Sequence, residues 1–129
     1  MDLSSLTPGR EVTRGVVYRR IPNREGYFDH DEGLPDLAAF VPRPQDNQAL
    51  SAHLDKEEAE AALASPALAG FGLCELDIGA MKDATAGRVT VEFFPTPNGR
   101  SHVRIHGCTD DEVRAILIAL ANVIREPDK

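Results

Sequence analysis

The chain has 129 residues, a formal net charge of −7, 42% hydrophobic residues and no Trp. This length is enough for one folded domain with a hydrophobic core and too short for two. We therefore expect a single domain over residues 1–129, with flexible ends at 1–10 and 127–129. An acidic chain is a poor general nucleic-acid binder, because phosphate binding needs clustered Lys and Arg.

The sequence also indicates the cellular compartment of the protein and whether it needs a cofactor. No apolar run approaches the roughly 20 residues of a membrane-spanning helix, and the opening segment MDLSSLTPGREV lacks the basic and apolar blocks of a signal peptide. Cys74 and Cys108 are too sparse for a disulfide framework. We expect a cytoplasmic protein with free thiols, no cofactor and no membrane association.

The first part of the chain is basic and then becomes irregular. Residues 1–27 carry five Arg and three acidic residues, so an anion is favoured there and nowhere else. Residues 12–21 have the β-branched and aromatic content of a strand, which Pro22 ends. Residues 22–48 predict a long irregular loop, with one helical turn in LPDLAAF.

The middle of the chain predicts a strand, a helix and a second strand. Residues 49–54 alternate between apolar and polar side chains, and a helix follows from Asp55, paired with Glu58 in a capping box, to Pro66. Residues 70–78 predict a strand, and 79–88 a turn or short helix.

The C-terminal third predicts a hairpin and an amphipathic helix. Strands at 89–93 and 102–106 flank a turn at Asn98-Gly99, and a helix over 109–125 starts with a capping box of Thr109 and Glu112. Its buried stripe contains Val113, Ile116, Leu117, Leu120 and either Val123 or Ile124. The element order predicts an α+β fold, a mainly antiparallel sheet with two helices packed on one face.

Polar side chains recur on one face of the strand at 102–106. His102, Arg104 and His106 alternate with apolar residues and so share a side. They form either an anion or substrate surface with a histidine that can move a proton, or simply the solvent face of the sheet. A metal at His106 and Cys108 is a weaker alternative, since His102 and His106 lie about 13 Å apart along a strand. We expect no metal site.

Two arginines end the first strand. Arg19 and Arg20 point to opposite faces, and Arg suits forked recognition of carboxylate or phosphate. Salt bridges to the acidic residues at 29–32 are the alternative. His53, beside the acidic helix, is either a base or a packed side chain. The candidate catalytic residues are therefore His102, His106 and His53, and the candidate ligand-binding residues are Arg19, Arg20 and Arg104.

Three short segments resemble motifs of a group of small uncharacterised bacterial proteins. Arg19-Arg20-Ile21 matches their Arg-Arg-Ile start, residues 35–40 stand at their Pro-x-x-Ala-Phe step, and residues 102–107 match a late His-x-x-Ile-x-Gly. The chain departs from them at Asp36, where a small hydroxyl residue is more typical. The resemblance implies a bacterial origin and no activity.

Two functions fit these observations. Small size, acidity and the lack of a catalytic motif favour a domain that acts by protein–protein interaction, such as an accessory subunit or a toxin-neutralising, defence-associated partner. The arginines, four histidines and long loop favour a small enzyme or a nucleotide binder for ADP-ribose or phosphoester groups. Convergence of Arg19 or Arg20 with His53 and His102 or His106 in one pocket would indicate an enzyme. We favour the protein–protein interaction function and keep the small enzyme or nucleotide binder as the alternative; self-association is left open.

Overall fold

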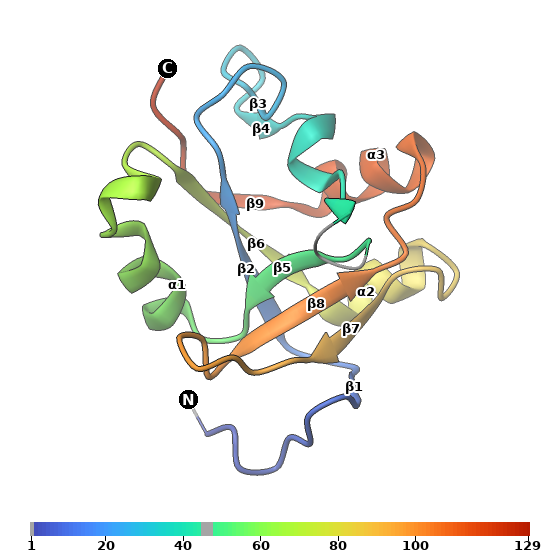
Figure 1. The fold of residues 1–129 in the computed structure, drawn as a ribbon. Coiled ribbons are helices and arrows are strands. Elements are labelled where there is room, and N and C mark those ends of the chain that lie inside the picture. The colour runs from blue at the N-terminus through green and yellow to red at the C-terminus, as the bar shows by residue number, and fades with distance from the viewer. Residues whose placement is uncertain (1, 45–47) are drawn as a thin grey trace.

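The computed structural model describes residues 2–44 and 48–129, which form a seven-stranded sheet and a separate two-stranded hairpin (Figure 1). The strand order of the large sheet is β1 (Glu11–Val12), β7 (Thr90–Phe93), β8 (His102–His106), β5 (Leu50–His53), β2 (Val16–Ile21), β6 (Gly72–Asp77) and β9 (Asn122–Arg125). Every neighbouring pair is antiparallel. The predicted α+β fold with an antiparallel sheet is confirmed.

Three α-helices cover this sheet in the described part of the chain: α1 (Lys56–Leu63), α2 (Ile78–Ala84) and α3 (Asp111–Leu120). The inner side of α1 packs with Tyr18, and the inner side of α3 packs with Val17. Because neighbours along a strand point to opposite faces, α1 and α3 lie on opposite sides of the sheet. The expected packing of these two helices on one face is not confirmed. Instead α2 contacts α3 and shares its side.

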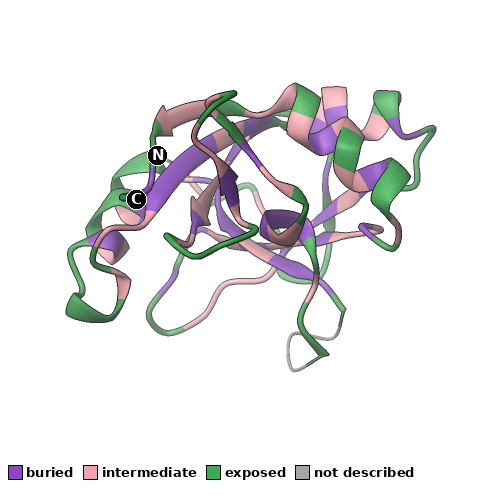
Figure 2. Cartoon of the chain, turned by 90° about the horizontal axis from the view of Figure 1, so that it is seen from above, coloured by how far each residue is buried: buried purple, intermediate pink, exposed green. Residues whose placement is uncertain are grey.

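The larger core lies between the sheet and α2, α3 and the 3-10 turn η1 (Leu37–Phe40). Buried residues run along the central strands, whereas the outer sides of the helices are exposed (Figure 2). Gly107 closes this core between β8 and α3. Its φ is +96°, and a Cβ there would collide with the backbone carbonyl of Arg88, so only glycine fits.

The helix termini differ from the predicted capping boxes. Asp55 caps α1 by accepting from the Glu57 amide, but Glu58 turns away to Ser101. The cap of α3 is Asp110 rather than Thr109, and it accepts from the Val113 amide. Both helices keep acidic residues in the first turn, where the helix dipole favours them.

The predicted helix over 109–125 is wrong at its C-terminal end. The helix stops at Leu120, and β9 follows as an edge strand paired with β6. Val123 and Ile124 are β-branched and favour a strand when a free sheet edge is available. The apolar spacing of the helix continues through Val123 and Ile124, so the sequence pattern alone favours a helix there. The free edge of β6 is what makes a strand possible instead.

The segment between β2 and β5 contains more regular structure than a long irregular loop. It includes the hairpin of β3 (Phe28–Asp29) and β4 (Leu34–Pro35), and the predicted helical turn is present as η1. Residues 45–47 of the expected loop lie outside the described residues.

Both ends of the described chain make backbone contacts. The Gly9 amide donates to the Phe93 carbonyl at 2.8 Å, and the Asp128 amide donates to the Gly70 carbonyl at 2.8 Å. Flexibility of the ends stays a prediction. None of the helices in the described ranges has the length and apolarity needed to span a membrane.

Candidate functional site

The central strand β2 has one incompletely paired edge. It pairs with β6 along its whole length, from Val16 to Ile21. With β5 it forms a single pair, between Tyr18 of β2 and His53 of β5. Beyond Tyr18 the Arg19 side chain takes the place of the missing strand contacts. Its Nη1 donates to the Ser51 carbonyl at 2.7 Å and its Nε to the Ala39 carbonyl at 2.8 Å. Arg19 thus links β2 to β5 and to η1.

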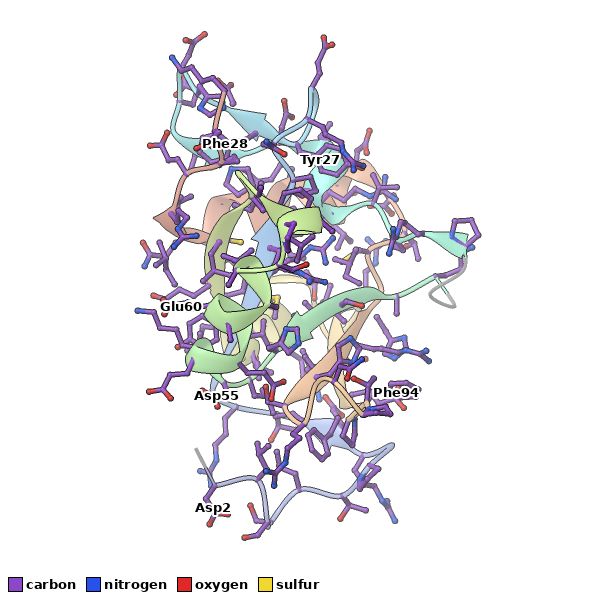
Figure 3. All side chains as sticks on the ribbon, turned by 60° about the vertical axis from the view of Figure 1, so that its left-hand side comes forward. Asp2, Tyr27, Phe28, Asp55, Glu60 and Phe94 are labelled. Carbon is purple, nitrogen blue, oxygen red and sulfur yellow. The ribbon has the colours of Figure 1, made fainter. Side chains whose placement is uncertain are left out.

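A cavity of about 280 Å³ opens at this edge. It lies between the end of β2, the start of β5, η1 and the 3-10 turn η3 (Pro66–Leu68). We call it the arginine pocket, because four arginines line it together with the aromatic residues Tyr27 and Phe71. The four are Arg19, Arg20, Arg24 and Arg43. Tyr27 is labelled in Figure 3, where it lies at the upper end of the molecule.

Three arginines of the pocket, Arg19, Arg20 and Arg24, have no acidic partner in its described lining. No Asp or Glu of the described residues lines it, and Arg19, Arg20 and Arg24 form no ion pair there. The alternative pairing of Arg19 or Arg20 with the acidic residues at 29–32 is therefore not found.

Burial acts on the two central guanidinium groups. Desolvation lowers the pKa of Arg19, and the neighbouring charge of Arg20 lowers it further. Desolvation also lowers the pKa of Arg20, with a second contribution from Arg43. Arginine remains protonated in proteins, so the pocket holds poorly solvated positive charge that an anion would stabilise.

A second polar cluster joins α1 to β8. Glu58 Oε1 accepts from the backbone amide of Ser101 at 3.0 Å and from its hydroxyl at 2.9 Å. His53 Nε2 lies 3.6 Å from the same oxygen, and its ring is 5.6 Å from that of His102. Burial lowers the pKa of His53, so this imidazole is neutral at pH 7.

This second cluster resembles a Ser–His–acid triad only in composition. A nucleophilic serine is hydrogen-bonded to the histidine that removes its proton. Here the fully buried Ser101 hydroxyl donates to the Glu58 carboxylate and accepts from the Asp55 amide. The arrangement holds α1 on the sheet. Sequence reasoning missed Glu58 and Ser101, which are 43 residues apart and share no local pattern.

The polar row on β8 is present, and each member has a partner on β7 or beside it. His102 Nδ1 donates to the Phe94 carbonyl at 2.8 Å, and the Arg104 guanidinium lies 3.6 Å above the Phe94 ring. His106 Nε2 donates to Glu92 at 2.7 Å. None of these three side chains lines the arginine pocket, and Figure 3 shows Phe94 far from Tyr27.

The predicted site residues therefore fall into two groups. Arg19 and Arg20 project from opposite faces of β2 and still line one pocket, because the strand edge between them is open. His53 and His102 are neighbours in the second cluster. The convergence expected for an enzyme does not occur. Sequence reasoning also missed four pocket residues, although the basic composition of residues 1–27 signalled one of them, Arg24. The four are Arg24, Tyr27, Arg43 and Phe71.

Comparisons of the chain with protein-family models, with curated proteins and with solved structures found no match. Across the ranges that the structure describes, no group of three or more His, Cys, Asp or Glu side chains is arranged to hold a metal ion.

Proposed function

We propose that this chain is a binding protein for a small anionic ligand, which the arginine pocket holds. The observation that carries the proposal is the charge of Arg19, Arg20 and Arg24 in a cavity that no Asp or Glu of the described residues lines. Guanidinium groups form forked, charge-assisted hydrogen bonds with carboxylate and phosphate. A bound anion would offset the cost of keeping these cations partly desolvated.

The size of the pocket and the charge of the chain favour a small ligand over a polyanion. The cavity of about 280 Å³ lies just below the usual range for small-molecule sites, about 300–1,000 Å³. The net charge of −7 would repel nucleic acid outside the pocket. A compact anion meets the local positive field without meeting that repulsion.

Binding, rather than catalysis, fits the side chains present. No histidine and no carboxylate among the described residues lines the arginine pocket. A general acid or base working near neutral pH is normally one of these groups. The histidines lie in a separate cluster whose hydrogen bonds are made to the protein itself.

Calorimetric titration with inorganic phosphate at constant ionic strength tests this proposal. The wild-type chain should bind phosphate saturably, and Arg20→Gln should weaken binding by about tenfold or more, because one charge-assisted hydrogen bond is lost. Arg14→Gln is the matched control: Arg14 is exposed and precedes the opposite end of β2. Equal binding by wild type and Arg20→Gln would refute the proposal.

A protein partner is the second candidate function, supported by a separate observation. Three large apolar side chains are exposed in β4, in η1 and directly after η1: Leu34 at 37%, Leu37 at 37% and Val41 at 45%. Val41 also lines the arginine pocket. Exposed apolar residues beside a polar site are common at protein interfaces. They support the second candidate, in which the chain acts as an accessory subunit or as a neutralising partner of another protein.

Pull-down from the native cell separates the two candidates. Under the partner proposal, the double variant Leu37→Glu with Val41→Glu abolishes recovery of a specific protein. Arg20→Gln also weakens this recovery if the partner inserts an anionic group into the arginine pocket, and otherwise leaves it unchanged. Recovery that is the same with wild type and with the double variant would exclude this surface.

A further inference from the structure

This inference rests on the proposed function and names the chemistry of the ligand. We propose that the arginine pocket binds a phosphate monoester whose organic part is a compact ring, with the phosphoryl group at Arg19 and Arg20 and the ring between Tyr27 and Phe71.

The distribution of donors favours phosphate over carboxylate. A carboxylate presents two oxygens in one plane, whereas a phosphoryl group presents three oxygens in a tetrahedral arrangement and carries a charge of about −1.5 to −2 at pH 7. Arg19 and Arg20 approach from β2, and Arg24 approaches from the separate chain segment that follows it. Donors from several directions match the tetrahedral group.

Arg19 retains capacity for such a ligand. A guanidinium has five N–H donors in a fixed plane. Two of them, on Nε and Nη1, are used by the Ala39 and Ser51 carbonyls. These hydrogen bonds hold the guanidinium in one orientation while its Nη2 side makes no hydrogen bond within the described residues. A preoriented donor binds an anion with less loss of side-chain entropy.

The apolar half of the pocket favours a ring on the ligand. Tyr27 precedes the β3–β4 hairpin, and Phe71 precedes β6, so the two aromatic residues line the pocket from different segments. Leu68 and Val41 extend the apolar surface. Inorganic phosphate has no group to cover these side chains, whereas an aromatic or similarly flat ring can pack against them.

The test is calorimetric titration at pH 7.5 with phenyl phosphate, benzoate and inorganic phosphate as probes. Phenyl phosphate should bind about tenfold more tightly than benzoate, because at least one more charge-assisted hydrogen bond forms. It should also bind about threefold to tenfold more tightly than inorganic phosphate, the gain expected of a ring contact.

Variants separate the two halves of the ligand. Phe71→Leu keeps an apolar side chain for packing but removes the ring, and it should reduce the advantage of phenyl phosphate over inorganic phosphate while leaving phosphate binding unchanged. Arg20→Gln should weaken both phosphates, and Arg14→Gln neither. Thermal melts of all three variants identify any that are poorly folded.

Each contrary result has a distinct meaning. If benzoate binds as tightly as phenyl phosphate, the phosphate assignment is wrong and anion binding stands. If inorganic phosphate equals phenyl phosphate, or Phe71→Leu leaves their ratio unchanged, the ring assignment is wrong. If none of the three probes binds, the proposed function fails together with this inference.

Discussion

Replacing Leu117 by Ala should remove a large part of the stability of this protein. Leu117 lies in the middle of α3 with no exposed surface and packs in the larger core. The substitution removes three carbon groups, worth about 0.8 kcal/mol each in transfer free energy, or about 2.4 kcal/mol together. The cavity left behind raises the expected loss to about 3–4 kcal/mol.

The matched control is Leu120→Ala in the same helix. Leu120 is only partly buried, so the same chemical change should cost less, about 1–2 kcal/mol. Leu and Ala are both strong helix formers, so helix propensity contributes little to either change. Any difference between them therefore measures burial.

Chemical denaturation followed by circular dichroism measures both losses. The unfolding midpoint of Leu117→Ala should fall by roughly 10–15 °C in a parallel thermal melt, because a chain of this length loses about 3–5 °C per kcal/mol. Equal losses at the two positions, or an unchanged midpoint for Leu117→Ala, would mean that α3 does not pack on the sheet as described.

Three further predictions concern buried groups. Because burial lowers the pKa of His53, the unfolded state binds the proton more readily than the folded state. The contribution of His53 to stability is therefore complete above the unfolded pKa of about 6.5 and falls as the pH drops below it. His53→Gln should flatten this part of the pH–stability curve. Burial raises the pKa of the Cys74 thiol to about 12 and of the Cys108 thiol to about 11, so an alkylating reagent at pH 8 should label both only after unfolding; rapid labelling of the folded chain would contradict their burial. Gly107→Ala should prevent folding or lower the midpoint strongly, since it combines a φ of +96° with a backbone collision; a melt like that of the wild type would show that the β8–α3 turn can shift.

Local patterns predicted much of the fold. The alternation of Val103 and Ile105 with polar residues placed β8 and its two faces correctly, because the side-chain period of a strand needs no knowledge of its neighbours. The apolar spacing in α3 and the acidic start of α1 predicted both helices for the same reason. The α+β class follows from the order of these elements.

Composition also indicated which part of the chain supplies most of the arginines of the pocket. The arginine-rich first 27 residues contain three of the four arginines that line the pocket. The sequence further predicted that Arg19 and Arg20 leave β2 on opposite faces, which agrees with their positions in an extended strand. That parity gave no sign that both side chains line the same pocket.

The tertiary structure decided the rest, because it depends on which strands become neighbours. Arg19 and Arg20 meet in one pocket only because β5 leaves β2 after Tyr18, and η1 and η3 then border the gap. The same long-range pairing turns residues 122–125 into an edge strand and puts α1 on the opposite side from α3. Sequence periodicity describes one element at a time. Contacts between segments tens of residues apart are set by the packing of the whole chain, and the arginine pocket is made of such contacts.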